Sequence, residues 1–337
     1  MFKRRIKKKG KLKYETQEKT VDEVFEKANK SSDFSTISPL QSHPRLLISF
    51  YKTLIDMKLL HQTLLPSLLE RNELIKELSS LKSIIPIEDI RISSDGSEIE
   101  KSLLKGYVVI QLDNNKQECA LINAGNSKLG KRESNETENE YSVIGPKTGF
   151  IEDLNINLHL IRNELVTSDL IFEEFVVGTR SQTKVVVAYL DGVTNPEYIH
   201  TARQRISSLD IDVLFDNSHL EQLIADHSTT PFPLFIVTER VDRAVYSLLS
   251  GRVALICGNS CYVVTGPANL MEFFSSPEDI YLPWVVATSL KLIRIIGMLF
   301  SIFSTSFYVA ILTYHFEVIP KDLLGPIVFS RANVPFP

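Results

Sequence analysis

This 337-residue chain has few cysteines, and no cleavable signal peptide is recognisable at its start. Both observations argue against a secreted, disulfide-bonded protein. Cysteine occurs three times, at Cys119, Cys257 and Cys261, without a C-x-x-C spacing. This small odd number predicts reduced thiols in a cytosolic compartment, and a bridge between Cys257 and Cys261 across a predicted hairpin is the alternative. A cleavable signal peptide is not expected, because Phe2–Lys13 contains no apolar core.

Motifs that carry chemistry are equally scarce. Neither G-x-S-x-G nor H-E-x-x-H occurs, and the histidines form one loose cluster whose spacing suits no common zinc site. That cluster contains Asp216, His219, Asp226 and His227. Gly125–Lys131 (GNSKLGK) matches a phosphate-loop pattern, but Arg132 replaces the required Ser or Thr and no helix is expected to follow. We therefore predict no enzymatic activity, no cofactor and no metal site.

Positive charge is concentrated at the start of the chain. Residues 1–13 contain eight Lys or Arg and no acid, so the overall net charge of −4 leaves the remaining body strongly acidic. An acidic body argues against a nucleic-acid-binding surface. Residues 1–44 are polar and predicted to be disordered. The basic tail is interpreted as a solvated arm, with contact to an anionic membrane leaflet as the functional alternative.

Long apolar runs are almost absent, and the one exception is Ile295–Tyr314. As a helix, its twenty charge-free residues would extend about 30 Å, the thickness of a bilayer's hydrocarbon core. Aromatic residues flank both ends, and Lys291 and Arg294 precede it, which places the preceding chain in the cytoplasm. We predict a transmembrane helix at 295–314 within a membrane region covering 283–337.

Small residues recur every fourth position along this predicted span. Gly297, Ser301 and Thr305 would lie on one helix face and allow close approach of another helix. Hydroxyl groups that bond back to their own helix are the simpler reading of the Ser and Thr. We predict a helix–helix interface on this face.

The region before the membrane run contains an internal duplication. Four pairs of segments recur in the same order: Arg45–His61 with Lys184–His200, Ile90–Gly106 with Phe235–Gly251 (both ending S-L-L-x-G), the strand pairs that follow each glycine, and Val143–Pro146 with Val264–Pro267. Such ordered self-similarity indicates two copies of one unit. The duplication predicts that Gly106 aligns with Gly251 and Val109 with Ala254.

Each copy reads as strand, helix, helix, strand, helix, strand, strand. Strands alternating with helices predict an α/β fold, and the closing hairpin predicts mixed sheets. We therefore expect two tandem similar α/β subdomains, at 45–146 and 168–270, followed by the transmembrane helix.

A predicted amphipathic helix lies between the two copies, within 147–167. Its apolar stripe contains Ile151, Leu154, Leu158, Ile161 and Leu165. We hypothesise that this region relays a signal between the two copies, through Gly145, Pro146, Gly149, Phe150, Asp153 and Leu158. This helix could simply pack on one of the two copies, and a hinge or lever between them is the functional alternative. If it is a lever, replacing Leu158 with Asp should undock it without unfolding either copy.

These residues resemble the A subunit of the GerA-type spore germinant receptors. The phrases that carry the resemblance span about Arg45 to the end: Gly145–Leu154 with Asn157–Arg162, Ile211-Asp212, Pro231-Phe-Pro233 with Thr238-Glu-Arg240, Leu249–Ala254, Ser276–Asp279 and Val334–Pro337. Lys52-Thr53 departs from the family's usual Asp-Gly, which the second copy keeps at Asp191-Gly192, and Leu234 replaces a residue that is commonly polar. The family continues into further membrane helices, so the chain is expected to be truncated after its first one.

The resemblance implies a subunit of a membrane nutrient receptor that triggers spore germination, as a signal relay, an oligomeric ion-channel component, or both. It also implies a transporter-like B-type subunit and a lipoprotein C-type subunit as partners, self-association, and a place in the spore inner membrane. The alternative function is a membrane-tethered module that binds a small molecule between its two α/β subdomains.

Overall fold

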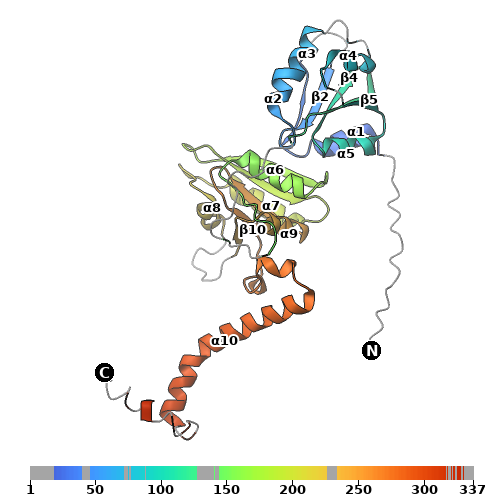
Figure 1. Ribbon diagram of the computed structural model, residues 1–337. Coiled ribbons are helices and arrows are strands. Elements are labelled where there is room, and N and C mark those ends of the chain that lie inside the picture. The colour runs from blue at the N-terminus through green and yellow to red at the C-terminus, as the bar shows by residue number, and fades with distance from the viewer. Residues whose placement is uncertain are drawn as a thin grey trace, which may run out of the picture. The chain divides into compact units, whose positions relative to one another are not determined.

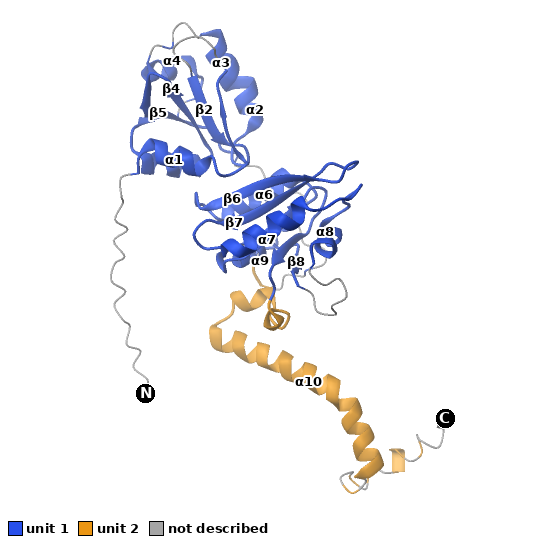
Figure 2. Cartoon of the chain, turned by 180° about the vertical axis from the view of Figure 1, so that it is seen from behind, with its two compact units in different colours: residues 1–142, 146–268 blue, residues 143–145, 269–337 orange. Residues whose placement is uncertain are grey.

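A computed structural model describes residues 19–315 except 40–45, 72–74, 76, 88, 127–139, 141–143 and 226–233, together with a few positions between 317 and 329. The basic tail and its proposed membrane contact lie outside the described residues. The chain divides into two compact units (Figure 2): one contains both copies of the duplicated fold, and the other contains the chain from Asn269 onward.

The first copy, called here the first repeat, extends from α1 to β5. Its elements are α1 (Val21–Ala28), β1 (Phe34–Ile37), β2 (Leu46–Tyr51), α2 (Met57–Leu59), η1 (Leu60–Leu64), α3 (Leu65–Glu70), η3 (Leu78–Ser80), α4 (Leu81–Ile84), β3 (Ile90–Ser93), α5 (Gly96–Leu103), β4 (Tyr107–Leu112) and β5 (Asn115–Asn123).

The second repeat extends from α6 to β10. Its elements are α6 (Leu154–Glu164), β6 (Leu170–Val177), β7 (Thr183–Leu190), α7 (Pro196–Ser207), α8 (Asn217–Ile224), β8 (Ile236–Thr238), α9 (Val241–Leu249), β9 (Val253–Cys257) and β10 (Val263–Gly266).

The two repeats share one topology, which confirms the predicted pair of similar α/β subdomains. Their strand orders are β1-β2-β4-β5-β3 and β6-β7-β9-β10-β8. The prediction of mixed sheets is wrong for the described strands, since every pairing is antiparallel. The helix α5 does join two strands that run in the same direction, but β5 lies between them and removes the parallel contact.

Strand registers agree with the residue equivalences that the duplication predicts. In the first sheet Val109 lies between Ser49 and Leu121, and in the second Ala254 lies between Ala188 and Thr265. The preceding glycines also match, because Gly106 and Gly251 adopt φ values of +84° and +82°. A positive φ is unfavourable for residues with a Cβ atom, which explains the shared glycine after each S-L-L-x.

Each repeat has three layers, with helices on both faces of its sheet (Figure 1). In the first repeat α1 and α5 pack on one face, and α2, η1, α3 and α4 on the other. In the second repeat α6 and α9 occupy one face, and α7 and α8 the other. Strand β7 supplies alternate residues to both cores, as expected for a strand covered on each side.

The predicted disorder of 1–44 is wrong for part of that segment. Helix α1 begins at Thr20, whose side chain forms a reciprocal capping box with Glu23, and β1 pairs with β2. These elements correspond to α6 and β6, so the duplicated unit is longer than the sequence comparison indicates. Helix α1 has only eight residues and β1 only four. Val21, Val24 and Phe34 are buried, but the polar residues around them in the sequence hide this apolar pattern.

Up to residue 315, the described part of the second unit contains two short 3-10 helices and one long helix. They are η4 (Leu270–Glu272), η5 (Pro277–Ile280) and α10 (Trp284–Tyr314). Helix α10 has 31 residues and is long and apolar enough to cross a membrane, judged by length and composition. It begins eleven residues before the predicted span, because Lys291 and Arg294 interrupt the apolar run without interrupting a helix.

Candidate functional site: the joint between the repeats

Helix α6 belongs to the core of the second repeat. Leu158 and Ile161 are buried there against β7 and α9. Asp153 caps the helix by accepting hydrogen bonds from the backbone N–H groups of Asn155 (2.8 Å) and Ile156 (3.3 Å). The predicted helix therefore forms, but it is a structural part of one subdomain and not a separate lever.

The chain entering α6 is fixed to the same repeat. Gly149 forms a bridge with Arg240, and the Phe150 N–H donates to the Glu239 carbonyl at 2.8 Å. Asn157 holds both the N–H and the carbonyl of Ile151 with its side-chain amide. Of the predicted relay residues, Leu158 thus lies within the second repeat, and Gly149, Phe150 and Asp153 are bound to it.

The outward face of α6 carries a buried arginine that binds the first repeat. Arg162 is fully buried and forms a two-point ion pair with Asp33, from Nε to Oδ2 at 2.8 Å and from Nη2 to Oδ1 at 2.9 Å. Its Nη2 also donates to the Ser31 hydroxyl at 3.1 Å and to the Leu170 carbonyl at 3.2 Å. One side chain therefore joins the turn before β1 to the first residue of β6.

Two aromatic rings enclose this guanidinium. The Tyr51 and Phe172 ring centroids lie 4.4 and 4.7 Å from the Arg162 Cζ, within the range of cation–π attraction. Burial raises the pKa of Tyr51 to about 12 despite the neighbouring Arg162 charge, so Tyr51 stays neutral at physiological pH. Arg162 Nη1 has no hydrogen-bond partner within the described chain. The ion pair is thus held in a buried, nearly closed site, where losing one partner is costly.

The backbone reinforces this joint. The Ser32 N–H donates to the Phe172 carbonyl at 2.8 Å, and the Phe172 N–H donates to the Ser31 hydroxyl at 3.1 Å. The turn before β1 is thereby docked onto strand β6 of the second repeat.

A second contact from α6 reaches the turn after β2. His159 Nδ1 lies 2.6 Å from the Thr53 carbonyl, and its Nε2 lies 2.9 Å from the Asn163 side-chain nitrogen. The neutral imidazole that carries its proton on Nδ1 satisfies both contacts, since the Asn163 amide can donate to Nε2.

At the edge of the joint, lysines of the first repeat form ion pairs with turns of the second repeat. The arrangement is the reverse of the Arg162 pair, in which the second repeat supplies the cation. Lys27 pairs with Asp169, and Lys30 lies 3.3 Å from Asp191. Burial disfavours the Asp169 carboxylate, but hydrogen bonds from Lys27 and Thr167 outweigh this effect and lower its pKa. Asp33 and Asp169 occupy equivalent positions before β1 and β6, so each repeat presents the same turn to a cation of the other.

A cavity of about 560 Å³ lies beside these contacts and is open to solvent. Leu54, Leu104 and Lys105 line it from the first repeat, and His159, Asn163 and Asp242 from the second. Pro146, another predicted relay residue, also borders it. Gly145 adopts a φ of +109° and belongs to the other compact unit, so it lies outside this site.

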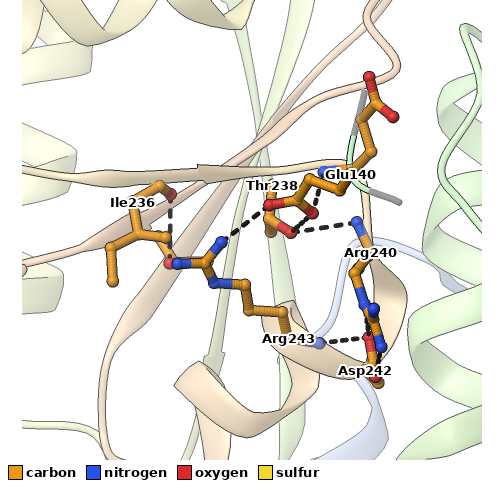
Figure 3. A network of polar contacts seen from close by, with 8 residues as sticks. Glu140, Ile236, Thr238, Arg240, Asp242 and Arg243 are labelled. Carbon is orange, nitrogen blue, oxygen red and sulfur yellow. Dashed lines mark hydrogen bonds and ion pairs between the residues drawn. The ribbon is translucent and has the colours of Figure 1, made fainter. Parts of the chain in front are cut away.

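Glu140 makes a further link between segments that are distant in sequence (Figure 3). Its carboxylate accepts from the Thr238 hydroxyl at 2.6 Å, the Glu239 N–H at 3.2 Å and Arg243 Nη1 at 2.8 Å. Beside it, the almost fully buried Arg240 forms a two-point ion pair with Asp242. The turn between β8 and α9 therefore binds Glu140, which belongs to the segment between β5 and α6.

Other residues singled out from the sequence are not among the described residues that form the joint. Asp226 and His227 lie outside the described residues, and nowhere in the described chain do three or more His, Cys, Asp or Glu side chains gather as a metal site would require. Ser301 and Thr305 lie on α10, as does Gly297, where a Cβ atom would meet no other atom within 4 Å. Their role as a helix interface stays a prediction.

The family model described as Bacillus/Clostridium GerA spore germination protein matches residues 19–337 of this chain. The chain belongs to this GerA family. It is 37% identical over 319 residues to the spore germination protein GerQA of Bacillus cereus, covering 95% of the chain and 63% of that protein. Spore germination protein GerIA of the same species is 38% identical, with 94% and 47% coverage. The GerA chain thus spans between about half and two thirds of these relatives' lengths.

A solved structure shares the fold of the two repeats. The crystal structure of the N-terminal domain of the A subunit of the Bacillus megaterium spore germinant receptor GerK3 matches with a TM-score of 0.55 and 23% identity. The match covers 73% of this chain and 92% of that one. At this identity the likeness shows the fold alone.

Sequence reasoning missed the residues that join the repeats. Asp33 lies in the segment expected to be disordered, and Arg162 lies on the polar side of a helix judged by its apolar stripe. A signal was present, because Ser32-Asp33 and Ser168-Asp169 each precede an apolar strand at equivalent positions. This fifth matching pair would have extended the duplication to include α1 and β1.

Proposed function

We propose that this chain is a subunit of a nutrient germinant receptor that triggers spore germination. Its repeats lie in the cytoplasm, and α10 crosses the spore inner membrane. Family membership, the names of the relatives and the length and composition of α10 support this proposal. Its partners are a transporter-like B-type subunit and a lipoprotein C-type subunit. The chain itself is not an enzyme.

The relay role rests on the joint around Arg162. A two-point ion pair enclosed by aromatic rings specifies one arrangement of the two repeats, because other arrangements would leave a buried charge unpaired. A nutrient-induced change in a partner subunit is passed on when it favours or disfavours this arrangement.

Deletion and complementation test the receptor role. Spores that lack this gene should lose germination with one nutrient class, and the intact gene should restore it. An affinity-tagged chain should copurify the B-type and C-type subunits from spore membranes. Unchanged nutrient responses in the deletion strain, across all nutrients that trigger the parent, would contradict the proposal.

Self-association is part of the proposal, and a surface of the second repeat favours it. In the first repeat Leu54 and Leu104 are 4% and 9% exposed, and both line the cavity against α6. Their equivalents Val193 and Leu249 are 53% and 57% exposed. The equivalence holds geometrically, since a Cβ atom on Gly106 would meet the Leu54 carbonyl and one on Gly251 would meet the Val193 carbonyl.

Tyr246, also exposed, precedes Leu249 by three residues on α9 and lies on the same side of that helix. We call Val193, Tyr246 and Leu249 the α9 patch. In the first repeat the equivalent surface is covered by the chain itself. We therefore propose that a second copy of the chain covers the α9 patch. The assembly built in this way would bring several α10 helices together as an ion-channel component.

A ligand-binding module is the second candidate function, and the cavity at the joint favours it. His159, Asn163, Lys105 and Asp242 offer donors and acceptors of both charges to a small polar molecule. In this case a nutrient should raise the thermal unfolding temperature of the purified chain, whereas a relay subunit should not respond without its partners.

A further inference from the structure

The chain that leads into α10 exposes large apolar side chains from a well-defined backbone. Capping boxes fix both short helices, Asn269 with Glu272 in η4 and Ser276 with Asp279 in η5. The exposed side chains around them are Leu270, Met271, Phe273, Ile280 and Tyr281. A fixed apolar surface of this kind marks a contact with a partner or a membrane.

An ion pair folds this segment back along the start of α10. Arg294 donates from Nη1 to Asp279 Oδ2 and from Nη2 to Oδ1, both at 2.8 Å, and from Nη1 to the Phe274 carbonyl at 2.9 Å. The pairing lowers the pKa of Asp279, so the pair stays ionised at physiological pH. Residues 274–279 are thereby held beside the third turn of α10.

Helix α10 is longer than a bilayer's hydrocarbon core. Its 31 residues extend about 46 Å, whereas the charge-free part, Ile295–Tyr314, already accounts for about 30 Å. The first eleven residues, Trp284–Arg294, are the excess, and α10 curves along its length in both views (Figure 1, Figure 2). Trp284, Val285, Leu292 and Ile293 are all exposed on this first part.

We propose that residues 270–294 form an interfacial elbow, lying in the headgroup region of the bilayer, and that the chain enters the hydrocarbon at Ile295. This proposal depends on the proposed function in one respect, since the elbow requires that the chain is bound to a bilayer. Lipid contacts the exposed apolar side chains of the elbow, because this apolar surface continues into the apolar helix and because Trp and Tyr side chains favour the membrane interface. Paired with Asp279, Arg294 can lie at the hydrocarbon boundary without an unpaired charge.

Trp284 is the only tryptophan of the chain, so its fluorescence reports the depth of the elbow directly. The full chain is reconstituted in phosphatidylcholine and phosphatidylglycerol vesicles whose acyl chains are brominated either near the headgroup or near the bilayer centre. We expect stronger quenching by the shallow bromines, by about twofold, and weak quenching by aqueous acrylamide.

Two results would overturn the elbow. An upright helix that enters the bilayer at Ile295 would carry Trp284 about 16 Å outside the hydrocarbon, where acrylamide quenches it and neither lipid does. The second result is quenching of Trp284 that is stronger with the deep bromines than with the shallow ones, or absent with all three quenchers. It would place Trp284 inside the hydrocarbon or beneath covering protein, respectively.

A variant tests the role of the ion pair. Asp279→Asn removes one charge of the pair, and we expect about twofold greater acrylamide quenching of Trp284. Glu278→Gln, which leaves the two-point pair intact, should match the parent. Equal quenching in all three chains would contradict a holding role for Asp279. Resistance to alkaline carbonate extraction reports membrane spanning separately, so a chain that is extracted fails the proposed function and not the elbow.

Discussion

At the scale of single residues, the account depends most on Arg162 and Asp33. Both side chains are almost completely removed from water, at 0% and 3% exposure. Replacing Arg162 with Met leaves the Asp33 carboxylate buried without its partner, which costs about 3–5 kcal/mol of unfolding free energy. Denaturant unfolding of the purified chain measures this loss. The double variant Arg162→Met/Asp33→Asn should recover part of it.

The exposed pair of Lys30 with Asp191 is the matched control at the same joint. Both side chains are about half exposed, so Lys30→Met should cost no more than about 1 kcal/mol. A control variant as unstable as Arg162→Met would mean that burial of the ion pair is not what matters.

Acid should weaken the joint through carboxylates whose pKa is lowered. Glu100 of α5 belongs to the joint because it accepts a hydrogen bond from the Ser168 hydroxyl, which precedes β6. The pKa of Asp169 falls below its ordinary 3.8 and that of Glu100 below 4.5, because hydrogen bonds from lysines and hydroxyls outweigh burial. The stabilisation is complete above the ordinary values and is lost as pH falls through the lowered ones. Unfolding free energy should therefore decline below about pH 4.5, and less steeply in Asp169→Asn.

Leu158 shows where residue-level prediction from the sequence was limited. Its place on an apolar stripe predicted burial, and Leu158 is indeed 5% exposed. The apolar stripe does not indicate which repeat's hydrophobic core contains Leu158. Because that core belongs to the second repeat, Leu158→Asp should unfold this repeat rather than undock α6, and loss of protease resistance in residues 154–266 would show it.

At the scale of elements, repetition made most of the fold predictable. The S-L-L-x-G endings placed α5 and α9, and the strand equivalences held in the registers. The sheets could not be predicted as antiparallel, because the position of β5 between β3 and β4 leaves no mark in the local pattern. Helix α1 and strand β1 were too short and too polar on their outer sides to be recognised.

The α9 patch gives a prediction at this scale. Leu249→Asp should lower the mass of the purified assembly toward that of one chain, because a charge at an apolar contact opposes association. Phe215→Asp is the control, since Phe215 is exposed as well but lies before α8, away from α9. Mass photometry in detergent distinguishes them. Equal masses for both variants and the parent would leave the patch without a role in self-association.

Gly297 supplies a second test, on α10. A Cβ atom there would meet nothing within 4 Å, so the chain itself tolerates Gly297→Leu. If another helix packs closely at this position, the substitution should reduce assembly in spore membranes, measured by cross-linking. Met298→Leu, one position along the same helix, should assemble normally. Normal assembly of both variants would argue against a close helix contact at Gly297.

At the scale of the whole molecule, a duplicated α/β region precedes one long apolar helix in a chain of the GerA family. The joint between the repeats was the part least accessible to sequence analysis, because its contacts connect residues more than a hundred positions apart. Hydrophobic periodicity reports what is buried, but not which partner buries it. The long apolar helix was accessible because length and lack of charge are local properties.

Transmission of the germination signal through the Arg162–Asp33 joint is the part of the proposed function that most needs a test. Its most direct test is the nutrient-triggered germination rate of spores whose only copy of this subunit carries Arg162→Met/Asp33→Asn, a double change that removes both charges together. The account predicts slow or absent germination with nutrient, normal amounts of the subunit in the membrane, and normal germination with a trigger that bypasses nutrient receptors. Germination at the parental rate, with the double variant present at parental levels, would contradict it.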